Sequence, residues 1–564
     1  MKVLLKGHDY KYEIAEFMKL FSSEFSFVEG SEDFDVIKEV ENSELVVNEL
    51  KIDRKKDRVD IFTETTVFKN GEIIYKKDIS EKIYIKEISE EEINNIILEK
   101  KGTLGNKNVL NSQYTMTDSS KSGNISTVIV DNNDHNKKIF AKTNKKLDNN
   151  IRTISKRIIE RSLFYYLNEK FDANVPWGIL TGIRPVKIVQ ELLDEGQKID
   201  EIKENMKREY LISDEKVQLI AEIALRERPF IYPATGETIS LYVSIPFCPT
   251  KCLYCSFPSH PLAKFGDYRH QYVETLLKEA KGLQGIIEKQ GKEIETLYIG
   301  GGTPTALEAD DLEYLINGLF DIFDLSKIKE FTVEAGRPDS ITREKLVALK
   351  NSGVTRISIN PQTMNQATLD FVGRKHSVGD IKDCFNMARE LGFRNINMDL
   401  ILGLPGETIE MVENTMEEIV SLNPESVTVH TLALKRASDL NINMESYKDA
   451  LIGYQTVIDM IELSRKYMDR FGYNPYYMYR QKHMLGNLEN IGYAKEGYEC
   501  LYNMQIMEER QSNYAIGAGA VSKFVYLDEN RIERVDDVKN LEVYLERVDD
   551  MIMKKYREVE KNGN

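Results

Sequence analysis

The sequence predicts an α/β protein built around a partial (β/α)6 barrel, with a small α/β domain and a helical segment before it and an α-rich extension after it. Two observations predict this fold class. Strand-like and helical runs alternate six times between Leu241 and Lys435, as in parallel strands joined by right-handed crossovers. The residues that are unusual for a packed core come directly after these strands, where parallel barrels place their functional sites.

Changes in composition divide the chain into five parts. They are a small α/β domain, a flexible insertion, a helical segment, the partial barrel and a C-terminal extension, at residues 1–101, 102–150, 151–236, 237–435 and 436–564. In the first part, three runs alternate as hairpin strands do, and Asn70-Gly71 is typical of the turn between two of them. The insertion is rich in Asn, Ser, Lys, Asp and Gly and has too few apolar side chains to form a core.

The alternation places six strands of the barrel and the helices between them. The strands are expected at Leu241–Phe247, Thr296–Gly301, Glu330–Ala335, Arg356–Pro361, Asn395–Gly403 and Ser426–Leu432. The helices are expected at Tyr268–Gln290, Asp310–Phe323, Arg343–Asn351, Val378–Leu391 and Thr408–Ser421. Six units are fewer than the eight that close a full barrel.

The charge balance and the cysteine content restrict the class of partner and the compartment. The net charge of −16 argues against broad binding to nucleic acid or to an anionic membrane, although an anionic small substrate needs only a local basic pocket. No apolar run approaches the length of a membrane span. Five cysteines and no export signal at the N-terminus predict a reducing cytoplasm.

Three cysteines follow the first barrel strand with the spacing C-x3-C-x2-C, at Cys248, Cys252 and Cys255. Three thiolates this close together can bind three irons of a cubane cluster and leave its fourth iron open to another ligand. A structural zinc site normally takes four protein ligands, and Cys384 and Cys500 are isolated. A C-x-x-C redox pair leaves Cys248 without a role. The spacing therefore favours an iron–sulfur cluster over the zinc and redox alternatives.

Further candidate residues come at the ends of the other barrel strands, and so at the same edge of the sheet. They are Gly300–Thr305, Glu334, Gln362, Asp399, Gly403–Thr408 and His430–Ala433. Glycines after a strand allow the backbone to approach a ligand closely, although a triple glycine can also form a tight turn with no ligand. The Gly403–Gly406 run can likewise do no more than end a strand and begin a helix.

With these motifs assembled, the chain resembles the radical S-adenosylmethionine (SAM) superfamily. Within it, four motifs resemble the oxygen-independent coproporphyrinogen III dehydrogenase family, namely Tyr242–Cys248, Gly300–Thr305, Arg356–Gln362 and Asp399–Gly406. The Cys252–Phe257 and Trp177–Pro185 runs resemble its HemZ branch. The resemblance also reaches the Gly517–Ala520 run of a HemN-like extension, but it gives little for residues 1–150.

The resemblance implies two cofactors and assigns residues to them. Cys248, Cys252 and Cys255 would hold a [4Fe-4S] cluster. The SAM contacts would be Tyr242 beside the cluster, Gly301, Gly302 and Thr303 at the amino group, Glu334, Gln362, Arg374 and Asp399 at the amino acid and ribose parts, and Ala433 at the adenine. Val521 would contact a second SAM. The resemblance names no catalytic side chain.

The activity implied by the resemblance is the oxidative decarboxylation of coproporphyrinogen III to protoporphyrinogen IX in haem biosynthesis, without oxygen. A 5′-deoxyadenosyl radical removes hydrogen from a propionate side chain, and an electron donor such as flavodoxin or ferredoxin reduces the cluster. One departure bears on turnover: Phe257 stands where the family has a further cysteine that is not a cluster ligand. Related barrels carry haem as chaperones or open the haem ring, so a haem chaperone or another tetrapyrrole protein is the alternative.

The two alternatives need different residues. A substrate with four propionates needs basic groups, for which the candidates are Arg184, Lys187, Lys435, Arg436 and Arg480. Residues of this type are more often surface charges than anion ligands. A haem carrier needs an axial ligand, for which the candidates are His430, His483 and the Tyr476–Tyr479 run.

Overall fold

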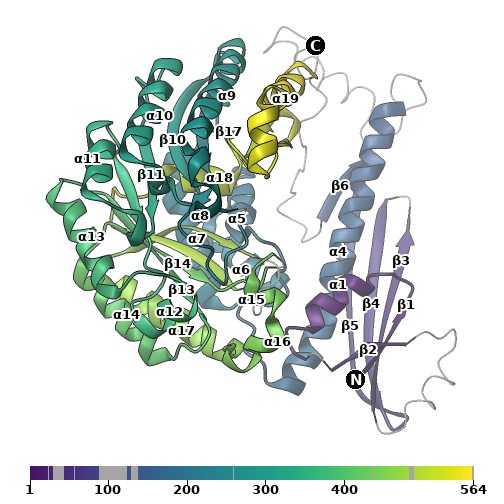
Figure 1. The fold of residues 1–564 in the computed structure, drawn as a ribbon. Helices are drawn as coiled ribbons and strands as arrows, with labels where there is room; N and C mark the ends of the chain where they lie inside the picture. Colours follow the sequence, from purple (N-terminus) through teal and green to yellow (C-terminus); the bar gives the residue numbers. More distant parts are fainter. Residues whose placement is uncertain are drawn as a thin grey trace. The chain divides into compact units, whose positions relative to one another are not determined.

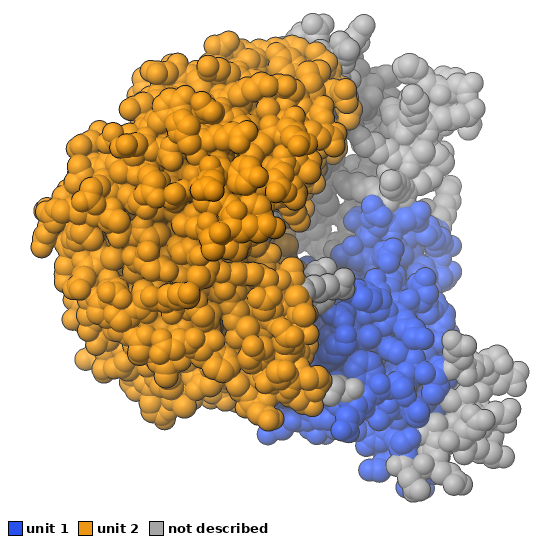
Figure 2. Space-filling model, in the orientation of Figure 1, with its two compact units in different colours: residues 1–181, 197–218 blue, residues 182–196, 219–564 orange. Residues whose placement is uncertain are grey.

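The computed structural model divides the chain into two compact units, which Figure 2 distinguishes by colour. Unit 1 is residues 1–181 with 197–218, and unit 2 is residues 182–196 with 219–564. The residues described are 1–22, 24–28, 43–55, 57–87, 124–128, 137–257, 259–435, 437–481 and 488–561. The segment 151–236 is helical as predicted, and it contributes residues to both units.

Unit 1 contains a six-stranded sheet with the strand order β2-β1-β3-β4-β5-β6. The elements are β1 (Lys2–Lys6), α1 (Lys11–Met18), β2 (Ser26–Phe27), β3 (Glu44–Arg54), β4 (Arg58–Lys69), β5 (Glu72–Glu87) and β6 (Asn124–Val128). The predicted hairpin is confirmed, because β4 and β5 pair antiparallel and Asn70 and Gly71 both have positive φ angles, 52° and 83°. Positive φ at both central residues is what a two-residue hairpin turn of type I′ requires.

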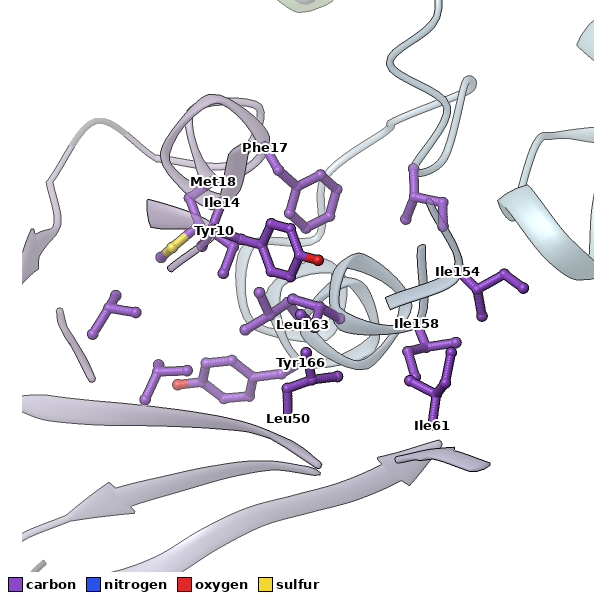
Figure 3. Packing of buried hydrophobic residues seen from close by; sticks show 14 of the residues in the cluster. Tyr10, Ile14, Phe17, Met18, Leu50, Ile61, Ile154, Ile158, Leu163 and Tyr166 are labelled. Carbon is purple, nitrogen blue, oxygen red and sulfur yellow. The ribbon is translucent and has the colours of Figure 1, made fainter. Parts of the chain in front are cut away.

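The long helix α4 (Lys137–Phe171) covers one face of this sheet. Its buried side chains pack with those of α1, β3 and β4, and Figure 3 shows Phe17, Leu50, Ile61, Ile158 and Leu163 from this cluster. Burial of this kind is the main source of a domain's stability, because apolar surface leaves water.

The prediction of a flexible insertion at 102–150 is wrong for its last part. The helix α4 begins at Lys137, and β6 also lies within the predicted insertion. The buried residues Ile151, Ile154 and Ile158 form an apolar stripe along one face of α4. Leu147 is also buried and continues their spacing, so this stripe extends into the polar sequence. Tertiary packing of that stripe outweighs the polar composition. Residues 102–123 and 129–136 lie outside the described part of the chain.

Three further helices make up the rest of the predicted helical segment. They are α5 (Pro185–Asp194), α6 (Ile199–Tyr210) and α7 (Asp214–Ile231). Pro185 is the first residue of α5, where its missing N–H and fixed φ suit a helix start.

Unit 2 contains an eleven-stranded sheet whose middle six strands are parallel and follow one another in chain order. They are β7 (Thr238–Ile245), β10 (Glu293–Gly301), β11 (Glu330–Gly336), β12 (Arg356–Ile359), β13 (Ile396–Leu402) and β14 (Ser426–Thr431). The helices α9 (Arg269–Gln290), α10 (Ala309–Ile322), α11 (Arg343–Asn351), α13 (Val378–Glu390) and α14 (Ile409–Leu422) form an outer arc around them (Figure 1). Side chains of Thr342, Ser377 and Thr408 cap three of these helices. The predicted partial barrel is therefore confirmed.

The C-terminal extension is helical as predicted but also supplies five strands to the sheet. Its helices are α15 (Asp439–Ile442), α16 (Met444–Tyr447), α17 (Tyr454–Arg470), α18 (Leu501–Glu508) and α19 (Leu541–Lys561). Its strands β15 (Asn474–Arg480) and β16 (Glu489–Ala494) join at β14, and β17 (Ser512–Ile516), β18 (Val521–Tyr526) and β19 (Arg531–Asp536) join at β7. The remaining short strands and α-helices are β8 (Phe247–Cys248), β9 (His260–Pro261), α8 (Leu262–Phe265) and α12 (Gln366–Phe371).

Among the described helices, none is both long and apolar enough to cross a membrane.

A buried ionic cluster attaches α19 to the barrel. Lys555 forms ion pairs with Glu279 on α9 and with Asp537, and all three side chains are fully or almost fully buried. Glu279 also accepts hydrogen bonds from the Tyr544 hydroxyl (2.5 Å) and from the backbone N–H of Gly517 (2.8 Å). The C-terminal helix thereby fixes the turn that follows β17.

Candidate active site

One cavity of about 420 Å³ lies at the carboxyl ends of the barrel strands, within the size range of small-molecule sites. The predicted ligand residues that line it are Tyr242, Cys248, Cys252, Cys255, Gly301, Gly302, Thr303, Glu334, Gln362, Arg374, Asp399 and Ala433. Val521, at the start of β18, is not among the lining residues. The structure thus brings together every predicted ligand residue but one.

The three cysteines lie on a loop that is fixed to the barrel by backbone hydrogen bonds. Cys248 pairs with the strand at His260–Pro261, and the N–H of Leu253 donates to the carbonyl oxygen of Val372 (3.0 Å). Burial raises the pKa of Cys248 to about 11, and it also raises the pKa of Cys255. Both groups are therefore thiols until a cation displaces the proton.

Two side chains donate hydrogen bonds to cysteine sulfurs. The Thr303 hydroxyl lies 3.6 Å from Cys248 Sγ, and Arg337 Nη1 lies 3.6 Å from Cys252 Sγ. Among the described residues, no three His, Cys, Asp or Glu side chains are grouped so as to hold one metal ion. A cubane cluster does not require such a grouping, because each thiolate binds a different iron.

The glycine turn after β10 packs directly against the cysteine loop. A Cβ atom on Gly302 would lie 2.6 Å from the carbonyl oxygen of Phe247 and 3.0 Å from Cys248 Sγ. Gly301 has a φ of 112°, which side chains rarely allow. The backbone N–H of Gly302 donates to the carbonyl oxygen of Ile245 (2.7 Å). Only glycine fits at position 302 without moving the cysteine loop.

Glu334 lies at the end of β11 beside a stack of tyrosines. Its Oε1 atom accepts a hydrogen bond from the Tyr298 hydroxyl (2.7 Å). The ring of Tyr298 stacks on Tyr242 and Tyr502, with centroid distances of 6.1 and 4.4 Å. Burial raises the pKa of Glu334 to about 7, and hydrogen bonding lowers it only in part.

Asp399 lies on β13 next to His430 on β14. Burial raises the pKa of the Asp399 carboxyl, but the hydrogen bond and charge of His430 and the Asn397 amide together outweigh it, so the net pKa is below the usual value. The amide of Asn397 donates to Oδ1 (2.7 Å), and His430 Nε2 lies 3.9 Å from Oδ2. Asp399 is therefore a charged acceptor in the cavity.

Two oxygen atoms at the end of β12 are buried and have no hydrogen-bond partner among the described residues. They are Gln362 Oε1 and Asn360 Oδ1, and both residues line the cavity. Gln362 has a φ of 69°, an uncommon conformation for a residue other than glycine. Arg374 lies nearby and donates to the Asn360 carbonyl oxygen (2.6 Å) and to the Tyr254 hydroxyl (3.3 Å). Unpartnered buried oxygens that face a cavity fit a polar ligand such as SAM.

Of the predicted basic candidates, Lys435 lines the cavity, whereas Arg184, Lys187 and Arg480 do not. Arg184 is paired with Glu509 instead, and Arg436 lies outside the described residues. Lys435 Nζ lies 5.5 Å from the centre of the Phe257 ring, and burial lowers its pKa. Within the part of the chain that the structure describes, Lys435 makes no ion pair.

The structure also adds residues to the site to which the sequence analysis assigned no contact with a cofactor. Arg337, Tyr254, Tyr298 and Asn397 all line the cavity. Arg337 comes directly after β11. It could therefore have been predicted in the same way as Glu334, because functional residues of such barrels lie at the carboxyl ends of the strands. Of the predicted haem ligands, His430, Tyr477 and Tyr479 line the cavity, and His483 lies outside the described residues.

Comparison with known proteins identifies the class of protein. Residues 242–419 match the model of the radical SAM superfamily. The chain is 42% identical over 375 residues to the oxygen-independent coproporphyrinogen-III oxidase-like protein HemZ of Bacillus subtilis (strain 168), which covers 66% of this chain and 74% of that protein. It is 34% identical to the heme chaperone HemW of Lactococcus lactis subsp. lactis (strain IL1403), over 50% of this chain and 68% of that protein.

A solved structure, coproporphyrinogen III oxidase (HemN) from Escherichia coli, is similar with a TM-score of 0.46 and 22% identity, over 58% of this chain and 73% of that one. The fold, the cysteine loop and the sequence match define a radical SAM domain. Within that superfamily, the chain belongs to the family of oxygen-independent coproporphyrinogen-III oxidase-like proteins.

Proposed function

We propose that the chain is a radical SAM oxidoreductase that oxidatively decarboxylates coproporphyrinogen III to protoporphyrinogen IX. The observation that carries the proposal is that the three cysteines and the other predicted ligand residues, except Val521, line one and the same cavity. When bound, a [4Fe-4S] cluster and SAM supply a 5′-deoxyadenosyl radical, at the expense of one electron from a donor such as flavodoxin or ferredoxin.

The chain's own residues have distinct tasks in this proposal. Cys248, Cys252 and Cys255 bind the irons, and Gly302 lets the glycine turn lie against them. The unpartnered Gln362 Oε1 accepts a hydrogen bond from SAM, and the charged Asp399 accepts hydrogen bonds from its ribose hydroxyls. Tyr242 and Tyr298, which stack on each other beside Glu334, form an aromatic part of the cavity lining.

Lys435 is proposed to bind a propionate carboxylate of the substrate. It is the cavity-lining cation that lacks a hydrogen-bond or ion-pair partner among the described residues, since Arg337, Arg374, Arg356 and Lys251 are all bonded to the protein. A half-buried cation without a counter-charge is costly, so an anionic ligand is favoured beside it. Phe257 is 62% exposed, which places this pair where substrate can reach it.

The direct test is anaerobic turnover by the reconstituted protein with SAM, a reductant and coproporphyrinogen III. We expect 5′-deoxyadenosine to form in a substrate-dependent manner and the porphyrin to lose two carboxyl groups by mass. The variant Cys255→Ala should form neither product. Deoxyadenosine without any change in porphyrin mass would show that the substrate is a different molecule.

The substrate contact is tested with Lys435→Met. We expect a rise in KM for the porphyrinogen with unchanged iron content, because Lys435 is not a cluster ligand. The matched control is Lys382→Met. It removes a lysine of the outer helix α13 that is paired with Glu418 on α14. If both variants behave alike, Lys435 does not bind the substrate.

A haem carrier is the second candidate, and two observations favour it. The relatives named heme chaperone HemW are 31–34% identical to this chain in three species, and Phe257 replaces the cysteine linked to turnover. His430 and Tyr479 in the cavity are candidate ligands. A haem titration of the parent and of His430→Ala, followed by absorbance, tests it: no tight binding by the parent excludes the carrier function.

A further inference from the structure

Arg337 is a buried cation that touches the cysteine loop. The residue is 4% exposed. Nη1 donates to the carbonyl and hydroxyl oxygens of Thr250, at 2.9 Å each, and lies 3.6 Å from Cys252 Sγ. The guanidinium therefore contacts both the backbone of the loop and one of the three cysteine sulfurs.

Asp339 fixes the orientation of this guanidinium. Arg337 Nε donates to Asp339 Oδ1 (2.8 Å) and Nη2 donates to Oδ2 (2.5 Å), a bidentate pair that leaves Nη1 for the loop. Burial raises the pKa of Asp339, but His376 and Arg337 outweigh it, so the net pKa lies well below the usual value and the carboxylate stays charged. His376, which is 3% exposed, also lies beside this carboxylate, with Nδ1 3.7 Å from Asp339 Oδ1.

We propose that Arg337 raises the reduction potential of the iron–sulfur cluster by donating a charge-assisted hydrogen bond to the Cys252 thiolate. The inference rests on the proposed function, because it needs a cluster on the three cysteines. Net charge and hydrogen bonds to the sulfurs are among the factors that set the potential of such clusters. Adding an electron makes the cluster more negative, so a nearby cation stabilises the reduced form more than the oxidised form.

The contact at Cys248 differs in kind from this one. Thr303 donates to Cys248 Sγ through a neutral hydroxyl, whereas Arg337 donates to Cys252 Sγ from a charged guanidinium whose counter-ion is Asp339. Hydrogen bonds from ionised donors are about twice as strong as neutral ones. The structure therefore assigns the larger effect on the potential to Arg337, and Asp339 and His376 act as positioning residues.

The test is an electrochemical titration of the reconstituted holoprotein without SAM, followed by the electron paramagnetic resonance signal of the reduced cluster. We expect the midpoint potential of Arg337→Gln to be more negative than that of the parent. The control Thr250→Ala removes one acceptor of Arg337 on the same loop but leaves the sulfur contact. The control Arg343→Gln removes an arginine from α11 whose partner is Glu390. Both controls should keep the parent potential.

Each outcome decides a different point. An unchanged potential in Arg337→Gln overturns the inference and leaves the proposed function standing. An equal shift in Thr250→Ala also overturns it, because the loop and not the charge would then be responsible. If Arg337→Gln holds no cluster, Arg337→Lys is measured instead, and an unchanged potential there overturns the inference. If the parent itself binds no iron, the proposed function fails.

Discussion

Glu334 accepts a 2.7 Å hydrogen bond from the Tyr298 hydroxyl, so the acidic residue at the end of β11 is fixed in place by the strand beside it. This pair joins two neighbouring parallel strands, and both of its residues line the cavity. The same surroundings raise the pKa of Glu334 through burial, which makes the site sensitive to pH near neutrality.

We expect Glu334 to reduce the stability of the ligand-free protein as the pH rises. Its pKa is about 7 in the folded chain against a usual value of 4.5, so between these values the folded state binds more protons than the unfolded state. Below pH 4.5 the carboxyl is protonated in both states, and the protein has its full stability from this group. That stability is lost as the pH rises from 4.5 through about 7. The loss amounts to at most about 3 kcal/mol.

This prediction is checked by comparing the parent with Glu334→Gln, a neutral residue of the same shape. Thermal unfolding of both should be measured at several pH values between 5 and 8. Relative to the parent, the variant should gain stability as the pH increases. A difference that does not change with pH would contradict the prediction.

Lys555→Met should destabilise the protein strongly. The variant leaves Glu279 and Asp537 buried without their cation, and removing one partner of a buried ion pair typically costs about 3–5 kcal/mol. Denaturant unfolding measures the change. The control is Lys561→Met on the same helix, where the lysine side chain is 72% exposed and should matter little.

Gly302→Ala should abolish binding of the cluster. The added Cβ would lie 2.6 Å from the carbonyl oxygen of Phe247, so either the glycine turn or the cysteine loop must move. Iron content and visible absorbance after reconstitution measure the loss. Gly266→Ala is the matched control, because no heavy atom lies within 4 Å of its added Cβ. Normal iron content in Gly302→Ala would show that the loop can adapt.

Asn48→Leu should destabilise unit 1. The Asn48 amide donates to the Thr65 hydroxyl (2.7 Å), and its oxygen lies 2.9 Å from His8 Nε2, so the variant removes both hydrogen bonds and places an apolar side chain against the buried Thr65 hydroxyl. Each hydrogen bond lost costs about 0.5–1.5 kcal/mol. Thermal unfolding of the full chain measures the effect, and the exposed Asn149→Leu serves as its control. Equal stability of both variants would mean that the amide network contributes nothing.

The central part of the fold could be predicted because its signals are local. Each barrel strand is a short apolar run followed by a helix, and all six are present at the predicted places. The strands of the C-terminal extension were not predicted, since β16 and β17 become sheet members by pairing with β14 and β7, far away in the sequence. The start of α4 was missed because the stretch before Ile151 is mostly polar, although Leu147 within it is buried.

By itself, the sequence determined the cysteine spacing, the glycine turn and the order of the barrel strands, because these depend on neighbouring residues and on crossover handedness. The tertiary structure decided which distant side chains meet. Arg337 contacts Cys252, which lies 85 positions earlier in the sequence, and Arg374 contacts Tyr254, which lies 120 positions earlier. Lys435 faces Phe257 in the same way. Such contacts depend on strand register and rotamers, which packing of the whole unit selects, so no local pattern contains them.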